Sequence, residues 1–310
     1  MDAGKVLGIV VTYNPVSEGL LPLLQSLESQ VETLLIIDNT SSDDDRITCI
    51  VGDLESKHPD LRVLRVGHNI GIAAAQNIGL EVALEERFDY VLLSDQDSLP
   101  DTDMVSVLRT ACLRMDAEGV SVGCICPMYF DRVTQQAFAF QVQRPGSVFY
   151  SSVFPDEASP CVEIITTISS GMLIPCAALR KVGSMRESFF IDHVDTEWCH
   201  RARAMGFRLF GTSSTRLLHR LGDASFRVWY FGWHSHSEYS PTRLYYRFRN
   251  FVLLCRLPHV PLRWRLRAAW YWTGNLYAHT LFAHARFANA KAIARGLRDG
   301  ITGKAGRLDS

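Results

Sequence analysis

The stretch Tyr90-Val91-Leu92-Leu93-Ser94-Asp95-Gln96-Asp97-Ser98 joins a short apolar run to two carboxylates that stand one residue apart. A run of this composition is typical of a buried β-strand. Asp95 and Asp97 would then lie at the end of that strand, where their oxygens suit a hard divalent cation such as Mg²⁺ or Mn²⁺. Because such a cation can hold a diphosphate, the stretch predicts a site for a phosphate-bearing ligand.

The rest of the chain repeats this alternation of strand and helix. With 310 residues, 47% of them hydrophobic and 21% charged, it can bury a large core and fits one domain with an appendage. The pattern predicts an α/β fold with a largely parallel sheet flanked by helices. We expect strands at 6–13, 34–37, 61–66, 90–94 and 122–126, and helices around 20–27, at 71–85 and at 104–114.

Three polar clusters follow the predicted strands and lie where such sheets bind ligands. They are Thr12-Tyr13-Asn14, Asp38 with the Asn-Thr-Ser-Ser that follows it, and Asn69-Ile70-Gly71. Asp38 can accept the N3 proton of a pyrimidine, and Asn69 with the Gly71 amide can approach ribose or phosphate. Each cluster is equally typical of turns and helix caps.

A second acidic segment reads Phe189-Phe190-Ile191-Asp192-His193-Val194-Asp195-Thr196-Glu197. A carboxylate beside a sugar cleft is the usual general base for a hydroxyl nucleophile, and Asp195 is our candidate. Asp192 or Asp195 can instead cap the helix expected to follow, where acidic residues also favour the helix dipole.

The C-terminal part is basic and aromatic. Residues 241–310 hold thirteen Lys/Arg and two Asp, whereas residues 1–240 hold 19 basic and 31 acidic residues. Tryptophan and tyrosine among the arginines favour a surface of anionic lipid over a nucleic acid, although a helical cap with a solvated basic face fits equally well. The uncharged stretch Ala268–Ala285 contains too many polar residues for a membrane span, so we expect an interfacial or packed helix.

The order of these motifs resembles that of the family 2 glycosyltransferases, inverting enzymes with a GT-A fold. The likeness extends from Val6 to about Asn250. It implies a Rossmann-like GT-A domain at 1–240 and a basic, aromatic helical extension at 241–310. It also implies roles for residues at matching positions: Thr12, Tyr13, Asn14, Asp38, Asn69, Gly71 and Asp95 for the nucleotide, Asp97 and His219 for Mg²⁺ or Mn²⁺, and Asp195 as the catalytic base.

Within this family the chain looks most like bacterial enzymes that use dTDP-L-rhamnose, because of Gln96 and the segment from Phe189 to Glu197. Val194 stands where many relatives place a glutamate, so either Asp192 or Glu197 would supply that charge. The resemblance implies an inverting transfer of L-rhamnose. The acceptor would be a lipid-linked or cell-surface glycan, such as an O-antigen or lipopolysaccharide precursor, at the cytoplasmic face of the inner membrane. Galactofuranose or hexosamine donors, a rhamnolipid-type acceptor and an inactive sugar-nucleotide-binding module are the alternatives.

The segment from Pro241 to Asn250 contains a Tyr-Tyr-x-x-Arg-Asn pattern that relatives share. Arg249 or Arg243 could bind the diphosphate as a lid closes. An amphipathic helix whose arginines face solvent fits the same pattern equally well.

Overall fold

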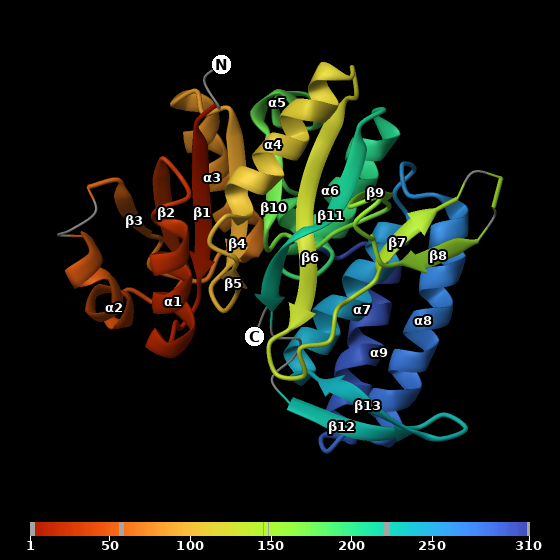
Figure 1. The fold of residues 1–310 in the computed structure, drawn as a ribbon. Helices are drawn as coiled ribbons and strands as arrows, with labels where there is room; N and C mark the ends of the chain where they lie inside the picture. The colour runs from red at the N-terminus through yellow and green to blue at the C-terminus, as the bar shows by residue number, and fades with distance from the viewer. Residues whose placement is uncertain (1–3, 56–58, 145, 148, 220–223, 309–310) are drawn as a thin grey trace.

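A central sheet with helices on both sides forms the body of the molecule, and three further helices pack below it (Figure 1). The computed structural model describes residues 4–55, 59–144, 146–147, 149–219 and 224–308. The main sheet contains β1 (Val6–Thr12), β2 (Thr33–Asp38), β3 (Leu61–Arg65), β4 (Tyr90–Asp95), β5 (Leu99–Pro100), β6 (Val122–Asp131), β9 (Cys161–Ile164), β10 (Met172–Pro175) and β11 (Arg208–His219).

The strand order is β3-β2-β1-β4-β10-β6-β11-β5, with β9 also paired to β11. The prediction of a largely parallel sheet is correct for β3, β2, β1 and β4. Beyond them β6 and β11 are again parallel, but β10 is inserted antiparallel to both β4 and β6, and β5 and β9 run antiparallel to β11. The insertion of β10 brings the residues just before it, Ser169 and Ser170, next to the end of β4.

Helices cover both faces of the sheet, with α1 and α4 in front and α3, α5 and α6 behind in the view of Figure 1. Their bounds are α1 (Ser17–Leu27), α2 (Arg46–Glu55), α3 (Ile72–Glu85), α4 (Met104–Ala117), α5 (Cys176–Val182) and α6 (Val194–Ala204), with the 3-10 helix η1 at Glu187–Phe189. The main core lies between these layers and includes all of the apolar side chains of β1. Close packing requires Gly79 of α3, because a Cβ there would lie 2.6 Å from Ile9 Cδ1.

The C-terminal helices are α7 (Pro241–Cys255), α8 (Leu262–Leu281) and α9 (Arg286–Thr302). Ser240 caps α7 by accepting a hydrogen bond from the Arg243 amide. The backbones of α7 and α9 cross closely, since a Cβ at Gly296 would lie 2.5 Å from the Tyr245 carbonyl oxygen. In the described part of the chain, no helix is long and apolar enough to cross a bilayer.

Two hairpins project from the body, β7 (Phe140–Gln143) with β8 (Tyr150–Val153) and β12 (Ala224–Trp229) with β13 (Trp233–Glu238). Phe226 and Val228 of β12 share a small core with Ala278 of α8 and Ala283. This hairpin therefore packs with the helices that follow it, although it precedes residue 241. The division into 1–240 and 241–310 stays a prediction.

Candidate active site

Polar side chains from distant parts of the chain meet at the carboxyl edge of the sheet. Thr12 and Asp38 end β1 and β2, and they lie side by side in the parallel register. Asp95 and His219 are the last residues of β4 and β11. Asp195 approaches the same edge from the first turn of α6.

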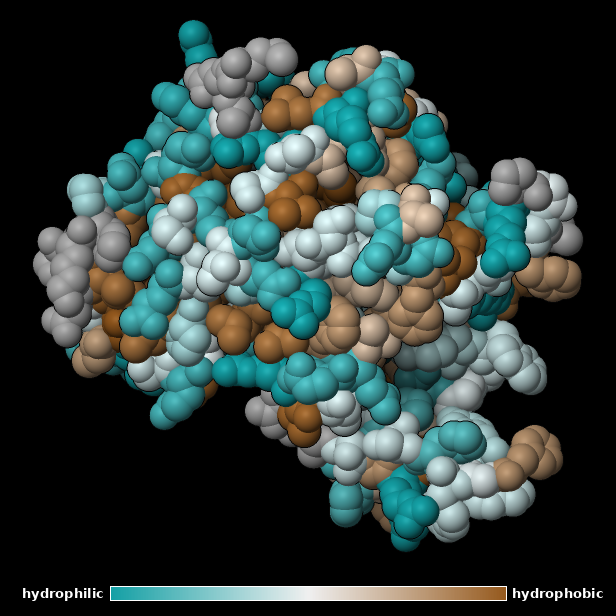
Figure 2. Space-filling model, in the orientation of Figure 1, coloured by the Kyte–Doolittle hydropathy of each residue, from teal (hydrophilic) through white to brown (hydrophobic). Residues whose placement is uncertain are grey.

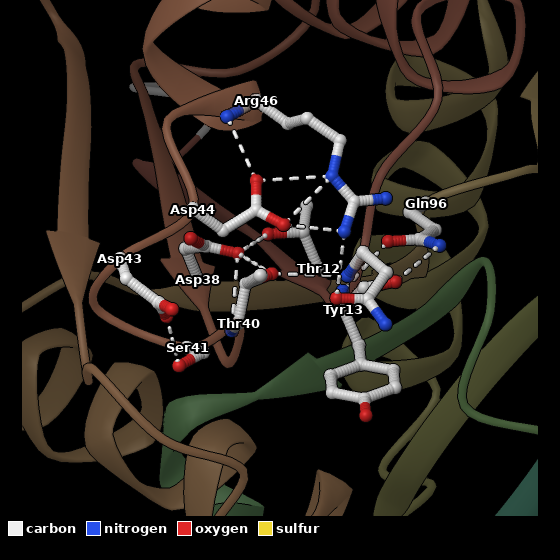
Figure 3. A network of polar contacts seen from close by, with 10 residues as sticks. Thr12, Tyr13, Asp38, Thr40, Ser41, Asp43, Asp44, Arg46 and Gln96 are labelled. Atoms are coloured by element: carbon white, nitrogen blue, oxygen red, sulfur yellow. Dashed lines mark hydrogen bonds and ion pairs between the residues drawn. The ribbon is translucent and has the colours of Figure 1, made fainter.

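The buried carboxylate of Asp38 forms the centre of one polar network (Figure 3). Its Oδ1 accepts hydrogen bonds from the hydroxyl groups of Thr12 and Thr40, both at 2.7 Å. Thr40 Oγ1 also accepts the Asn14 amide at 2.9 Å. Because these hydroxyls hold Oδ1, the carboxylate is fixed in orientation, and Oδ2 is the oxygen suited to accept an imide N–H from a pyrimidine.

Gln96 joins the end of β4 to the end of β1. Its side-chain oxygen accepts the Tyr13 amide at 2.8 Å, and its Nε2 donates to the Tyr13 carbonyl at 3.1 Å. The Tyr13 ring points away from the Asp38 network and is 50% exposed (Figure 3). Gln96 therefore fixes the backbone of Tyr13, and the Tyr13 ring presents one face at the edge of the site.

Arg46 is a site residue that the sequence did not indicate. Its guanidinium pairs with Asp44 and donates to Asn14 Oδ1 at 3.1 Å, which places it over the same network (Figure 3). It begins α2, a helix that was not predicted. A signal did exist, since Arg46 lies in the polar segment that follows the end of β2 at Asp38, where ligands of such sheets bind. A fixed cation at this position suits an anionic ligand.

Asn69 and Gly71 form a turn, and the contact of Gly71 with ribose or phosphate stays a prediction. The Gly71 amide donates to Asn69 Oδ1 at 2.9 Å, so it is already bonded inside the protein. Gly71 has φ +88°, and a Cβ there would lie 2.5 Å from the Phe190 ring. Glycine is thus required for the approach of Phe190. Asn39 further ties this turn by donating to Asn69 Oδ1 and accepting the Ile70 amide.

A chain of buried hydroxyl groups joins His219 to the acidic strand end. His219 Nδ1 lies 3.0 Å from Ser98 Oγ, which lies 2.6 Å from Ser170 Oγ, and Ser170 Oγ accepts the Asp95 amide at 3.2 Å. Residues from β4, β11 and the segment before β10 are therefore held together. This contact brings the imidazole of His219 next to the turn that contains Asp97, as the sequence led us to expect.

Asp97 and His219 have the chemistry of a divalent-metal pair, a carboxylate and an imidazole whose Nδ1 is oriented by Ser98. Among the described residues there is no cluster of three or more His, Cys, Asp or Glu side chains that could hold a metal ion. The two side chains fit a site that is completed by oxygens of a bound ligand, which is the usual pattern for Mg²⁺ with nucleotide phosphates.

The carboxyl groups of Asp95 and Asp195 are both half-buried and close enough to influence each other. Burial raises the pKa of Asp95, nearby Asp97 raises it further, and His219 and Arg243 oppose the shift. Burial also raises the pKa of Asp195 to about 6, with a further increase from Asp95. A carboxylate with a pKa in this range can take up a proton near neutral pH, as a general base must.

Asp195 is also tied to the backbone around it. Its Oδ1 accepts the Thr196 amide at 2.6 Å, and its Oδ2 accepts the Ser169 amide at 3.2 Å. The alternative that Asp192 or Asp195 caps the helix is wrong, because His193 is the N-cap residue of α6 and no side chain caps it. The two hydrogen bonds instead fix the direction of the Asp195 carboxylate. The Ser169 contact links α6 to the same segment that carries Ser170.

The loop before α6 has a strained backbone, with positive φ at Phe190, Asp192 and His193. Asn250 of α7 holds it, because Nδ2 lies 2.7 Å from the carbonyl oxygens of Phe189 and Ile191 and 3.0 Å from that of Asp192. The chain terminus adds support, since the Gly306 amide donates to the Ser188 carbonyl and the Leu308 amide to Tyr246 Oη.

Arg249 does not fit its predicted role in binding a diphosphate. It is fully buried and donates to the carbonyl oxygens of Phe189 and Gly306 and to Asn250 Oδ1. The Arg249 guanidinium therefore holds the loop before α6 in place. The alternative, an arginine that faces solvent, is also wrong for this residue because it is buried. Arg243 and Arg247 are the arginines of this helix that lie near an acidic group, at 3.5 Å and 3.8 Å from the Asp192 carboxylate.

The two acidic residues that could replace the absent glutamate at Val194 differ in their surroundings. Glu197 is buried and forms ion pairs with Arg186, Arg201 and His259. Asp192 instead faces Arg243 and Arg247 beside the strained loop. Asp192 therefore lies next to Arg243, which also acts on Asp95, but which of the two residues replaces the glutamate stays a prediction.

Comparison with known sequences finds two relatives and one family. Residues 9–154 match the family described as Glycosyl transferase family 2. The chain is 31% identical over 264 residues to a Shigella flexneri protein named dTDP-rhamnosyl transferase RfbF, a match covering 85% of this chain and 84% of that one. A Haloferax volcanii protein named low-salt glycan biosynthesis hexosyltransferase Agl10 is 24% identical over 201 residues, covering 63% of this chain and 60% of that one.

Solved structures resemble the fold. GalNAc-T7 with UDP, GalNAc and Mn²⁺ superposes with a TM-score of 0.61 at 10% identity over 97% of this chain. This chain spans 56% of the length of that protein. S. aureus TarS residues 1–349 with UDP-GlcNAc gives 0.58 at 19% identity, covering 97% of this chain and 81% of that one. These likenesses confirm the predicted GT-A-type architecture with C-terminal helices.

Proposed function

Because this chain belongs to glycosyl transferase family 2, we propose that it transfers L-rhamnose from dTDP-L-rhamnose to a hydroxyl group of a lipid-linked or cell-surface glycan. Membership of the family makes the protein a glycosyltransferase that uses a nucleotide-sugar donor. The observation that carries the choice of sugar is the 31% identity, over 85% of this chain, to a protein named dTDP-rhamnosyl transferase.

In this proposal the nucleotide base lies against Asp38, with Oδ2 accepting the N3–H of thymine. The hydroxyls of Thr12 and Thr40 support this arrangement, since they hold Oδ1 and leave the carboxylate one fixed direction. Asn14 and the Tyr13 ring border the same pocket, and Arg46 supplies a cation for a phosphate oxygen. Asn69 shapes the turn beside the ribose, and Asp95 faces the ribose.

Asp195 acts as the general base in the proposed transfer. Its carboxylate removes the proton of the acceptor hydroxyl as the oxygen forms a bond to the anomeric carbon, and the bond from that carbon to the diphosphate breaks with its electron pair. A single displacement from the opposite face inverts the configuration. The proposal is supported by the burial of Asp195, its pKa near 6 and its fixed orientation.

Asp97 and His219 would hold Mg²⁺ or Mn²⁺, which when bound supplies positive charge for the departing diphosphate. Ser98 keeps the imidazole in place through Nδ1. Arg243 contributes a further cation near Asp95 from the opposite side of the site. Asp195 would therefore accept the proton of the acceptor, whereas the metal ligands and Arg243 would act on the negative charge of the diphosphate.

A donor screen tests the proposal. The protein is incubated with dTDP-L-rhamnose, a UDP-galactofuranose or a UDP-hexosamine, in Mg²⁺ or Mn²⁺, with bacterial lipid extract as acceptor. Mass spectrometry of the lipids detects transfer, and nucleotide release gives kcat/KM. We expect a preference of at least about tenfold for dTDP-L-rhamnose. A higher kcat/KM for another donor would refute rhamnose as the transferred sugar, but it would not affect the assignment to the family.

Two controls separate catalysis from binding. Asp195→Asn should bind dTDP normally and transfer no sugar above background. Asp38→Asn should weaken dTDP binding, because an amide presents an N–H donor where the thymine N3–H needs an acceptor. If neither substitution changes its measurement, the roles assigned to both residues are wrong. Addition of EDTA should abolish transfer, and either Mg²⁺ or Mn²⁺ should restore it.

We also propose that the enzyme works as a peripheral protein at the cytoplasmic face of the inner membrane, because a glycan acceptor attached to a lipid carrier is presented there. The basic, aromatic composition of residues 241–310 supports this location.

A further inference from the structure

Exposed aromatic and leucine side chains gather on the outer face of α8 and on the turn between β12 and β13. We name this surface the aromatic ridge; it consists of Trp229, Phe231, Trp233, Leu262, Leu266, Trp270 and Tyr271, all of them exposed. Phe231 is 99% exposed and Trp270 82%. The hairpin turn projects at the lower right of the molecule, next to the lower part of α8, and the space-filling view shows that corner standing out from the body (Figures 1 and 2).

The two parts of the aromatic ridge are continuous. Leu262, Leu266 and Trp270 follow one another at four-residue spacing, which places them along one face of α8. The next position in that row is Gly274, whose carbonyl oxygen accepts the Tyr230 hydroxyl of the hairpin turn at 2.8 Å. Tyr277 also donates to the Trp229 carbonyl at 3.3 Å. The turn therefore continues the row of α8 at its end.

The segment of the chain that carries the aromatic ridge is strongly basic in sequence. Between Ala224 and Arg298 the sequence holds twelve Lys/Arg and one acidic residue, Glu238, and Glu238 lies 3.3 Å from His284. Arg263 and Arg267 are exposed beside the leucine row and lie over the Tyr150 ring. Arg227 is likewise exposed and lies over the Trp233 ring. Aromatic side chains together with arginines and few acidic groups match the interface of an anionic bilayer.

The opposite face of α8 contacts the strained loop before α6. The Trp272 ring lies 5.3 Å from the His193 ring and 5.2 Å from the Arg247 guanidinium. Arg247 in turn lies 3.8 Å from Asp192. A helix is about 10 Å across, so a surface in contact with the aromatic ridge lies about one helix diameter from the loop that precedes Asp195.

We propose that the aromatic ridge is the surface by which the protein binds an anionic lipid bilayer, with Trp229, Phe231 and Trp270 inserted among the head groups and Arg263 and Arg267 paired with lipid phosphates. This inference rests on the proposed function only in one respect, that the acceptor is carried by the membrane. The bilayer then brings the acceptor to the side of the site where the loop before α6 lies. Binding itself needs neither donor nor acceptor.

Vesicle flotation of the full chain tests the inference. Vesicles of phosphatidylethanolamine with 30% phosphatidylglycerol are compared with pure phosphatidylcholine vesicles, without nucleotide or metal. The double variant Phe231→Ser, Trp270→Ser removes two exposed side chains, and Met205→Ser, 52% exposed at the end of α6, is the matched control. We expect the double variant to lose at least about tenfold in affinity for the anionic vesicles, while Met205→Ser binds as the wild type does.

A second pair of substitutions tests the charges. Arg263→Gln and Arg267→Gln should each weaken binding to the anionic vesicles by about fivefold and make it less sensitive to salt, without an effect on phosphatidylcholine vesicles. Circular dichroism and hydrolysis of dTDP-L-rhamnose should be unchanged in every variant, since none of these residues belongs to the site.

Three results would overturn the inference: a wild-type protein that does not float with anionic vesicles, a double variant that floats as well as the wild type, or a dimer in solution that the double variant dissociates. The last result would show that a second copy of the chain covers the aromatic ridge. A failed donor screen leaves vesicle binding intact, so the two proposals fail separately.

Discussion

Replacement of Asp195 by asparagine should make the protein more stable at neutral pH and inactive at the same time. The carboxyl has an ordinary pKa of 3.8 and a pKa of about 6 in the folded protein, mainly because it is buried. The folded state therefore binds the proton more tightly than the unfolded state. The resulting destabilisation is absent below pH 3.8, grows as the pH rises towards about 6, and is complete above it.

A shift of about two pH units corresponds to about 3 kcal/mol of lost stability at pH 7.5. Asparagine removes this penalty because it carries no charge. Its side-chain oxygen can still accept the Thr196 amide, but its NH₂ group would face the Ser169 amide, which now donates to Oδ2 at 3.2 Å. The loss of that bond costs about 1 kcal/mol. We therefore expect a net gain of about 2 kcal/mol at pH 7.5 and a net loss of about 1 kcal/mol at pH 4.

Urea unfolding in EDTA, without donor, measures this difference at the two pH values. Asp116→Asn, an exposed carboxylate on α4, is the matched control and should change stability by less than about 0.5 kcal/mol. Sugar transfer by Asp195→Asn should fall by at least about a hundredfold. Equal destabilisation of the variant at both pH values would refute the burial penalty, and undiminished transfer would refute the role as base.

Four other outcomes follow from the same contacts. The kcat/KM of the wild type should rise with pH to a plateau, with a midpoint near 6 where Asp195 loses its proton in the free enzyme. Asn250→Ala should leave three buried carbonyl oxygens without their donor, lower the free energy of unfolding by about 2–4 kcal/mol and reduce kcat, both measurable on the purified variant. Gly296→Ala should lower that free energy by about 1–3 kcal/mol, since its Cβ would lie 2.5 Å from a carbonyl oxygen of α7. Ser98→Ala should weaken Mn²⁺ binding by about tenfold in a metal titration, because His219 loses the partner of Nδ1; an unchanged dissociation constant would remove His219 from the metal site.

The first half of the fold could be predicted from the sequence because its signals are local. The predicted runs at 6–13, 61–66 and 104–114 match β1, β3 and α4 to within a few residues. Buried parallel strands are continuous apolar runs, so they are easy to recognise in a sequence. The antiparallel insertion of β10 could not be predicted, because strand direction depends on pairing between distant segments. The helix α2 was missed since its short, polar start follows a turn.

Within the site, the grouping of Asp38 and Asp95 at one edge follows from the ends of two predicted strands. The strand that ends at His219 was not predicted, and that residue was named only through the family resemblance. Buried arginines are different. Arg249 was expected to bind a diphosphate because relatives share its Tyr-Tyr-x-x-Arg-Asn segment and a guanidinium suits phosphate. Only the tertiary structure reveals the carbonyl oxygens that surround this guanidinium. Gly71 was predicted to contact ribose or phosphate because a glycine allows close approach to its backbone. In the structure the Phe190 ring makes such an approach, and the sequence does not reveal this contact.

The hydrogen bonds of Gly306 and Leu308 have a practical consequence for laboratory work. These residues hold Ser188 and Tyr246 beside the strained loop. An affinity tag or fluorescent protein fused close to Leu308 would pull on the backbone next to Asp195 and would depress turnover in a way easily mistaken for a poor substrate. Gly4 and Lys5 precede β1 at the opposite end of that strand from Thr12, so purification handles are better attached on that side.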